Sequence, residues 1–307
     1  MALGTNQNTT TTAAKYIPEL WSDEVIAAYK SNLVLANLIT KYDHSGKKGS
    51  VLHIPNFTRS SASAKSANTQ VTLVAPTHTE TTITINKHFE YSVVIEDIVA
   101  TQALDSLRNA YTDDAGFALA KQIDTDLTQL GRGVNGLAGN NTYATHAFIG
   151  GDGTTAYVAG SNNENNLTDA GIRRTIQRLD ENSYPLEGRF LTVPPSQRNA
   201  LMGIARFTEQ AFVGEVAGGN TIRNGQIGSL YGVPVYVTNQ CDTTSGSANA
   251  RVCILGHKSF AGLATHVGVR SQTQYKQEYL GDLFTADTLY GVAELRNDGA
   301  FVLIVPA

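Results

Sequence analysis

The stretch that decides the fold is Glu96-Asp-Ile-Val-Ala-Thr-Gln-Ala-Leu-Asp-Ser-Leu-Arg-Asn-Ala-Tyr-Thr-Asp-Asp-Ala-Gly-Phe-Ala-Leu-Ala-Lys-Gln-Ile-Asp-Thr-Asp-Leu-Thr-Gln-Leu130. Its apolar residues recur at three- and four-residue steps, which places them on one stripe of an α-helix. At ~1.5 Å per residue, about 35 residues predict a rod roughly 50 Å long. The members of the stripe are Leu104, Leu107, Tyr111, Ala115, Ala118, Leu119, Ile123, Leu127 and Leu130.

Two carboxylates near the end of this rod could be read as a pair for acid/base chemistry. Asp124 and Asp126 are two residues apart, however, and on a helix that spacing points side chains to different faces. We therefore expect solvated helix charges. Gly131 and Gly133 follow and are residues that commonly end a helix.

The chain before the rod begins with a polar tail and an apolar arm. Residues 5–14 are almost all Thr and Asn, which is too polar to form a core. Residues 18–42 carry broad apolar coverage, including Trp21 and Tyr29, and predict a helix. An apolar arm behind a polar tail is poorly explained as a free-standing unit. We expect it to lie across its own core or across another subunit.

Between the arm and the rod, the pattern changes to β. Residues 49–90 contain segments rich in Thr and β-branched residues, and they predict a long antiparallel ribbon. Its tip, residues 58–70, is small and polar and carries Arg59 and Lys65. A two-stranded ribbon is marginal in water, so this one must lean on something larger. The alternating residues that then lead into the rod are Phe89, Tyr91, Val93 and Ile95.

The remainder of the chain predicts a compact mixed unit followed by a return to strands. Gly- and Asn-rich turns run to residue 166 and punctuate short strands. Ser196 is the expected cap of the second helix beyond them. The expected helices are 168–182, 197–205 and 257–264, and the expected strands are 189–193, 233–238, 251–255, 267–275, 288–296 and 300–305.

Composition narrows the class of protein. The chain has 307 residues, a net charge of −4, only 16% charged residues and no basic run, which disfavours a nucleic-acid reader or an anionic-membrane binder. Cys241 and Cys253 lack zinc-site spacing, so we expect two buried free thiols. No secretion signal or long apolar run is visible. These features predict a protein that stays soluble in a reducing compartment.

Motifs that would carry catalysis or a cofactor are weak. Gly131-Arg-Gly133-Val-Asn-Gly136 has the spelling of a dinucleotide loop, but a helix precedes it where a strand is required. The seven histidines are scattered without metal-ligand spacing. We therefore expect no enzyme activity, no catalytic, cofactor-binding or metal-binding residues, and no cofactor. A soluble α+β hydrolase or a carbohydrate-binding module is the alternative from a different class.

The order of parts is distinctive: arm, polar ribbon, one very long helix, compact α/β unit and terminal strands. Leu191-Thr-Val-Pro-Pro195 and the run Asn224-Gly-Gln-Ile-Gly-Ser-Leu-Tyr-Gly-Val-Pro-Val-Tyr-Val-Thr-Asn239 add local signatures. The whole chain resembles the major capsid protein of tailed bacteriophages, with the HK-ninety-seven type coat fold. The resemblance implies an α+β fold with an N-terminal arm, an extended β-hairpin E-loop, a long spine helix, and peripheral and axial domains.

The resemblance also implies domain bounds. They are 1–48 for the arm, 49–90 for the E-loop, 91–133 with 265–307 for the peripheral domain and spine helix, and 134–264 for the axial domain.

The implied function is that of a major capsid protein. Copies of the chain would form the hexamers and pentamers of an icosahedral head that encloses double-stranded DNA without reading its sequence. The implied partners are copies of itself, a separate scaffolding protein, a portal and decoration proteins, with no membrane. The implied location is the virion, after assembly in the host bacterial cytoplasm. The alternative within the fold is the shell protein of an encapsulin-like nanocompartment.

Candidate inter-subunit contacts follow from the arm, the ribbon and the helix at 168–182. The three arginines of that helix could pair with carboxylates of an adjacent subunit or only solvate a helix face. Some relatives join subunits covalently through an E-loop Lys and a distant Asn. Lys65 and Asn297 are the matching residue types here, but no activating carboxylate is visible, so we expect no such bond. The candidates are Trp21, Tyr29, Arg59, Lys65, Arg173, Arg174 and Arg178.

Overall fold

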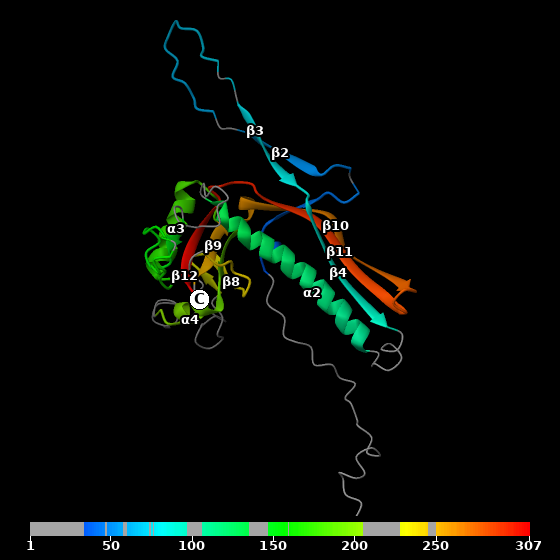
Figure 1. Ribbon diagram of the computed structural model, residues 1–307. Coiled ribbons are helices and arrows are strands. Elements are labelled where there is room, and N and C mark those ends of the chain that lie inside the picture. Colours follow the sequence, from blue (N-terminus) through cyan, green and yellow to red (C-terminus); the bar gives the residue numbers. More distant parts are fainter. Residues whose placement is uncertain are drawn as a thin grey trace, which may run out of the picture.

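The structure is a computed structural model. It describes residues 34–46, 48–57, 60–73, 75, 77–96, 106–134, 147–158, 160–204, 228–244 and 250–307. The tail and most of the arm, with Trp21 and Tyr29, lie outside the described residues, as does Arg59. Figure 1 shows an α+β molecule with one long helix, two sheets and a projecting ribbon. The predicted fold class is confirmed at this level.

The long helix is α2, Ser106–Gln129, which continues into a 3-10 turn at Leu130–Arg132. Its 24 residues correspond to about 36 Å. The expected start of the rod at Glu96 is wrong. Glu96 ends strand β4, Lys87–Glu96, because the alternating pattern of that strand continues to its last residue. Residues 97–105 lie outside the described part of the chain.

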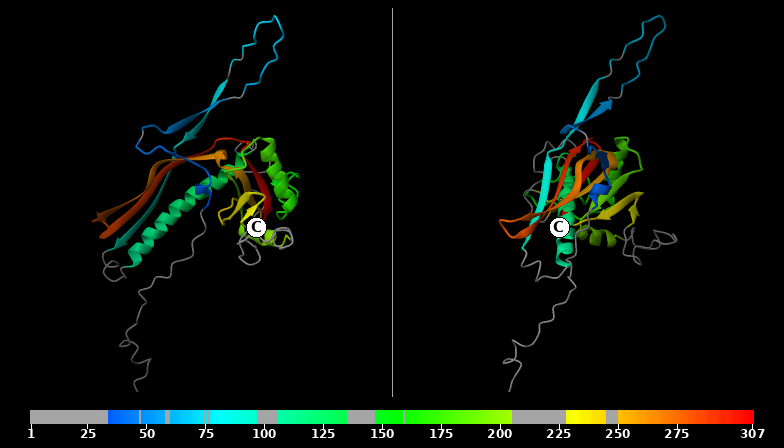
Figure 2. Two further views of the ribbon diagram at one scale, coloured as in Figure 1. Left: turned by 180° about the vertical axis from the view of Figure 1, so that it is seen from behind. Right: turned by 90° about the vertical axis from the view of Figure 1, so that its right-hand side faces the viewer.

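A four-stranded sheet lies beside α2, in the order β1 (Thr40–Asp43), β10 (Ala261–Lys276), β11 (Gly281–Glu294), β4. Ala115 and Leu119 of the helix pack on Phe284 and Ala286 of β11. Burial of these side chains stabilises the contact between helix and sheet. Figure 2 shows the helix running along this sheet.

Two predicted helices are wrong in this region. The arm helix was expected to reach Tyr42, but that residue pairs with Ala264 in a parallel ladder between β1 and β10. The expected helix at 257–264 is a 3-10 turn, Lys258–Phe260, followed directly by β10. The first four residues of β10 are all buried. A short, fully buried apolar run has no amphipathic period, so helix and strand cannot be distinguished from it.

A six-stranded sheet forms the second body. Its order is β5 (Phe148–Ile149), β12 (Ala300–Pro306), β9 (Ala250–His257), β6 (Arg189–Val193), β8 (Val233–Val237), β7 (Ser229–Leu230). The central strands β12, β9 and β6 are almost entirely buried. Helices α3, Asp169–Glu181, and α4, Pro195–Met202, flank the sheet (Figure 1). The strands expected here are confirmed.

The cap expected for α4 is wrong. The residue preceding the helix is Pro194, and Pro195 occupies the first turn, where a missing N–H costs nothing. Ser196 instead donates a hydrogen bond from its hydroxyl to the carbonyl of Pro306, at 3.2 Å. This contact ties α4 to the end of β12.

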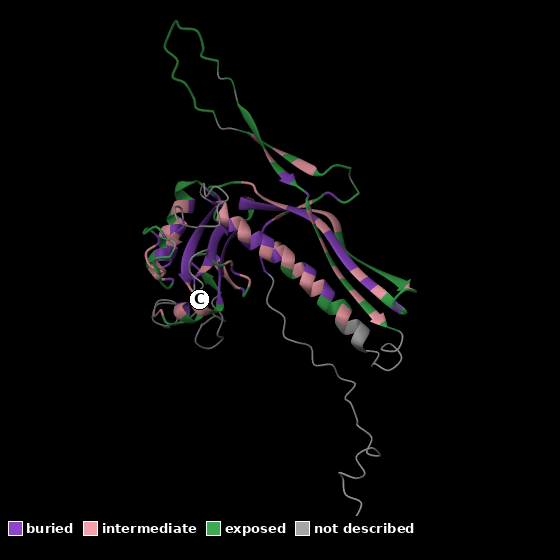
Figure 3. Ribbon diagram, in the orientation of Figure 1, coloured by how far each residue is buried: buried purple, intermediate pink, exposed green. Residues whose placement is uncertain are grey.

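The predicted ribbon is confirmed as β2, Val51–Phe57, paired antiparallel with β3, His78–Thr84. Only its base joins the body, where Ile83 is fully buried and packs near Ala264. Beyond the paired strands, the ribbon tip (residues 60–73) projects away from both sheets and is exposed throughout (Figures 1 and 3).

Asp124, expected to be a solvated charge, is fully buried on α2. Its carboxylate accepts hydrogen bonds from the backbone N–H groups of Val34 and Ala36, at 3.3 and 3.2 Å. Burial is the main effect on this group and raises its pKa. Asp124 therefore fastens the first described residues of the chain to the spine helix.

Asp126 is also buried rather than solvated, at 6% exposure. It accepts a hydrogen bond of 2.7 Å from the hydroxyl of Tyr290 and lies 3.0 Å from the ammonium nitrogen of Lys87. These partners come from β11 and β4. The two carboxylates point to different faces as predicted, but both faces are covered, one by the chain entering at residue 34 and one by the sheet.

Candidate assembly surfaces

Three large apolar side chains in or beside the ribbon tip are exposed. Leu73 is 88% exposed, Val71 is 58% exposed, and Phe57 at the end of β2 is 72% exposed. Lys65 is also exposed in the tip. Isolated exposed apolar residues are ordinary, but here they lie on a segment with almost no body of its own. The tip is therefore the first candidate contact surface.

Helix α3 presents the three predicted arginines in different environments. Thr168 caps the helix by accepting from the N–H of Gly171. Arg173 is exposed and pairs with Asp169 one turn earlier, at 3.0 Å. Arg174 donates to Gln177 at 2.8 Å. Arg173 and Arg174 thus contact partners on their own helix, which leaves their predicted role toward another subunit untested.

Arg178 does not lie on the solvated face. Its guanidinium carbon is 3.5 Å from the centre of the Phe148 ring, a cation–π arrangement. Burial and the neighbouring Arg174 lower its pKa. One of its terminal nitrogens, Nη1, is buried without a hydrogen-bond partner among the described residues. Arg178 therefore joins α3 to β5 rather than offering a free charge.

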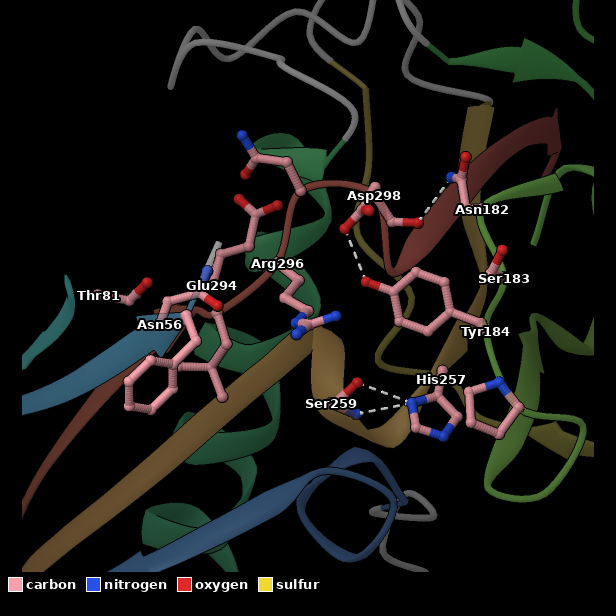
Figure 4. Close-up of a pocket in the computed structure, with 14 residues that line it drawn as sticks. Asn56, Thr81, Asn182, Ser183, Tyr184, His257, Ser259, Glu294, Arg296 and Asp298 are labelled. Carbon is pink, nitrogen blue, oxygen red and sulfur yellow. Dashed lines mark hydrogen bonds between the residues drawn. The ribbon is translucent and has the colours of Figure 1, made fainter. Parts of the chain in front are cut away.

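A cleft of about 900 Å³ lies between the ribbon base and the six-stranded body. Asn56 and Thr81 line it from the ribbon, and Tyr184 and Asp298 line it from the body (Figure 4). The Tyr184 hydroxyl donates to a carboxylate oxygen of Asp298 at 2.7 Å. Burial and this hydrogen bond raise the pKa of Tyr184 to about 12. The tyrosine is consequently a fixed hydrogen-bond donor that holds the β11–β12 turn.

Glu294 lies in the same cleft, at the end of β11. Burial raises its pKa to about 7. When the side-chain amide of Asn297 is oriented with its nitrogen toward Glu294, this nitrogen donates to both carboxylate oxygens of Glu294, at 2.7 and 3.2 Å. The fold thus places a carboxylate beside Asn297 that the sequence did not reveal, and the expectation that no covalent bond forms stays a prediction. No sequence signal identifies Glu294, because only the tertiary fold buries it.

Other chemistry is sparse in the described part of the chain. Within those residues, no group of three or more His, Cys, Asp or Glu side chains could hold a metal ion. Cys241 and Cys253 are buried free thiols, as predicted, and burial raises the pKa of both. No described helix is long and apolar enough to cross a bilayer.

Solved structures define the class of protein to which this fold belongs. The chain is similar to a structure from Mycobacterium phage Che8, with a TM-score of 0.74 and 23% identity over 94% of this chain and 97% of that one. It is similar to the capsid structure of cyanophage P-SCSP1u, with a TM-score of 0.75 and 19% identity over 99% and 96%. The capsid of Ralstonia phage GP4 gives 0.65 and 14% over 94% and 95%. The fold is that of HK-ninety-seven type capsid proteins.

Sequence comparison gives the family. A family model described as phage capsid protein matches residues 79–306, well over half of the chain. The chain belongs to this phage capsid protein family, and it is a structural protein of the capsid. A search of curated proteins finds no match. The family match favours the viral interpretation over a cellular nanocompartment.

Proposed function

We propose that copies of this chain assemble into the hexamers and pentamers of an icosahedral phage head that encloses double-stranded DNA. One observation carries the proposal. The ribbon tip is exposed throughout, and no backbone hydrogen bond ties it to another segment within the described residues. An extended segment gains stability only from a surface that compensates its ordering. In a shell, adjacent copies supply that surface.

Electron microscopy of the purified full chain tests this proposal. Hollow spheres or rings of subunits are the expected result. A matched variant in which a short Gly-Ser link replaces residues 60–73 keeps both sheets, so it should stay folded but form fewer rings or shells. Discrete small particles for the full chain at high concentration would contradict self-assembly.

The remaining partners follow from the capsid role. A separate scaffolding protein, a portal and decoration proteins complete the head, which is assembled in the host bacterial cytoplasm and becomes the virion. A net charge of −4 suits a wall that repels packed DNA rather than binding it. Filter binding at 0.15 M salt should therefore retain little DNA, and tight retention would contradict this part of the proposal.

The domain division is also a proposal. The E-loop spans 49–90, the axial domain 134–264, and the peripheral domain 91–133 with 265–307, behind an arm at 1–48. Strand pairing supports one change: β12 belongs with the axial domain, because it pairs with β9 along its whole length. Limited proteolysis that releases a fragment ending before Ala300, with β9 intact, would contradict this assignment.

A covalent bond between subunits is a second candidate function, which the contact of Glu294 with Asn297 favours. In this reaction, the Lys65 amine of one copy attacks the side-chain carbonyl of Asn297 in another. Glu294 takes the proton from the lysine nitrogen as the new C–N bond forms. It then gives that proton to the Asn297 amide nitrogen, whose C–N bond breaks so that ammonia leaves. Denaturing gels of assembled shells should then show a ladder that Lys65→Arg and Glu294→Gln each abolish. Monomer alone in wild-type shells would dispose of this function.

A further inference from the structure

The fold brings the two cysteines of the chain together in the six-stranded body. Thr243 forms an antiparallel bridge with Arg251 of β9. In an antiparallel pair, a step back along one strand matches a step forward along the other. Continued by two residues, this register brings Cys241 opposite Cys253. The two residues are far from any close Cys spacing in the sequence, so only the strand pairing makes them neighbours.

Opposed residues at this position approach each other closely. The backbone N–H of Val252 donates to the carbonyl of Asp242 at 3.0 Å, which makes these two residues the hydrogen-bonded pair of the short ladder. The pairs on either side are then non-hydrogen-bonded, and in such pairs the Cα atoms lie about 4.5 Å apart. Disulfides span Cα separations of about 4.4 to 6.8 Å. A bond between Cys241 and Cys253 therefore needs little movement of the backbone.

Both thiols also lie on one face of the sheet. Cys241 and Arg251 line the same cleft, which has a volume of about 310 Å³. Arg251 and Cys253 point to the same side of β9, because strand residues two apart share a face. Burial raises the pKa of both thiols, and the nearby Cys241 adds to the rise at Cys253. Such an electrostatic influence acts between neighbouring groups.

The cleft gives a small reagent access to only one of the two thiols. Cys241 is 6% exposed and lines the cleft together with Pro195, Asn239 and Ala307. Cys253 is fully buried and belongs to the apolar core on this side of the sheet. Cys241 is thus the thiol that an outside reagent reaches first, and Cys253 reacts through it.

We propose that Cys241 and Cys253 form a disulfide within each subunit when the shell leaves the reducing cytoplasm. The Cys241 thiolate attacks a low-molecular-weight disulfide, whose S–S bond breaks, and a mixed disulfide and one small thiol result. The Cys253 thiolate then attacks the Cys241 sulfur, the mixed disulfide breaks and a second small thiol leaves. The protons of the two cysteines go to the two departing thiolates. The protein is oxidised and the small disulfide is reduced by the same two electrons.

The bond would lock a joint of the subunit. Asp242, next to Cys241, accepts two hydrogen bonds from the guanidinium of Arg132, at 2.6 and 2.8 Å. Arg132 ends the 3-10 turn that continues α2, and Cys253 lies on a central strand of the six-stranded sheet. The disulfide therefore ties the segment that holds the spine helix to the middle of this sheet. Its setting rests on the proposed function, whereas its chemistry is testable on unassembled subunits.

Thiol counting on the folded, unassembled full chain tests the bond. The chain is incubated with oxidised glutathione, unfolded in urea with a maleimide-linked polyethylene glycol, and run on a non-reducing gel. The wild type should lose both thiols and remain a monomer. The matched control carries Thr243→Cys with Arg251→Cys, at the observed bridge, in a chain whose Cys241 and Cys253 are both replaced by Ala. If the control oxidises while the wild type keeps both thiols, or if the wild type forms linked dimers, the inference is overturned.

Single variants test the order of the two steps. Cys253→Ala should stop at the mixed disulfide and carry one glutathione by mass spectrometry. Cys241→Ala should carry none, because the cleft does not reach Cys253. Glutathione on Cys253 alone would contradict the assigned roles.

Urea unfolding measures the lock itself. The oxidised wild type should have an unfolding equilibrium constant at least about tenfold smaller than the reduced wild type, because the bond restricts the unfolded chain. Equal constants would mean that the bond locks nothing. A chain that never assembles would refute the proposed function, and the thiol counts on subunits would still decide on the disulfide.

Discussion

Replacing Glu294 by Gln should stabilise the unassembled subunit at neutral and alkaline pH. Burial raises the pKa of this carboxyl from its ordinary 4.5 to about 7, so the folded protein disfavours its charged form. The native state then holds a proton that the unfolded chain releases between about pH 4.5 and 7. Stability from this group is full below pH 4.5 and is lost as the pH rises through 7. Glutamine keeps the shape without the charge.

The magnitude follows from the same values. A rise from 4.5 to about 7 corresponds to about 3 kcal/mol once the group is fully ionised in both states. Between pH 5 and pH 8 the difference is about 2 kcal/mol, allowing for the partly solvated side chain. Glu294→Gln removes this dependence. The variant should therefore match the wild type near pH 5 and exceed it by about 2 kcal/mol at pH 8.

Urea unfolding of unassembled subunits at pH 5, 6, 7 and 8 measures this difference. Glu278→Gln, which removes an exposed carboxyl from the β10–β11 turn, controls for the loss of one charge and should run parallel to the wild type. If Glu294→Gln also runs parallel to the wild type across this range, the carboxyl ionises normally and the reasoning about its burial is refuted.

Three further substitutions test the packing. Tyr290→Phe deletes the donor to buried Asp126 and should cost about 1–3 kcal/mol in urea unfolding, and an unchanged midpoint would show that the hydrogen bond is immaterial. Gly291→Ala places a Cβ against the carbonyl oxygen of Thr84, so we expect loss of soluble folded protein by circular dichroism, and wild-type folding would contradict it. Gly116→Ala on α2 meets nothing within 4 Å and should raise stability by about 1 kcal/mol in urea unfolding, whereas a loss would show a hidden contact.

The sequence predicts elements well where side-chain period and turn chemistry agree. Helix α3 has a Thr cap and an amphipathic pattern, and the ribbon strands alternate, so both are found where expected. Prediction fails for one fully buried segment, the start of β10. The start of β10 is apolar on both faces, and its period therefore says nothing about helix or strand.

The features of the candidate surfaces also differ in how far the sequence predicts them. The ribbon tip is predictable over residues 60–70, because the composition of that segment cannot support a core. Glu294 is not predictable, because its properties come from burial in a cleft between distant segments. Asp124 and Asp126 are misjudged for a related reason: helix geometry gives the direction of a side chain but not what covers it. Contacts 88 and 164 residues apart decide the outcome.

The joint between the ribbon and the body determines how a contact at the exposed tip would bear on the rest of the subunit. Ile83 is fully buried at the ribbon base, and Gly291 of β11 lies so close to the backbone of Thr84 that no side chain fits between them. The strand that follows, β4, is held to the spine helix through Lys87 and Asp126. The ribbon base is thus packed against the sheet and, through β4, joined to the helix, whereas the tip contacts neither sheet. A neighbouring copy that contacts the tip would therefore fix the orientation of the whole subunit as well as that of the ribbon.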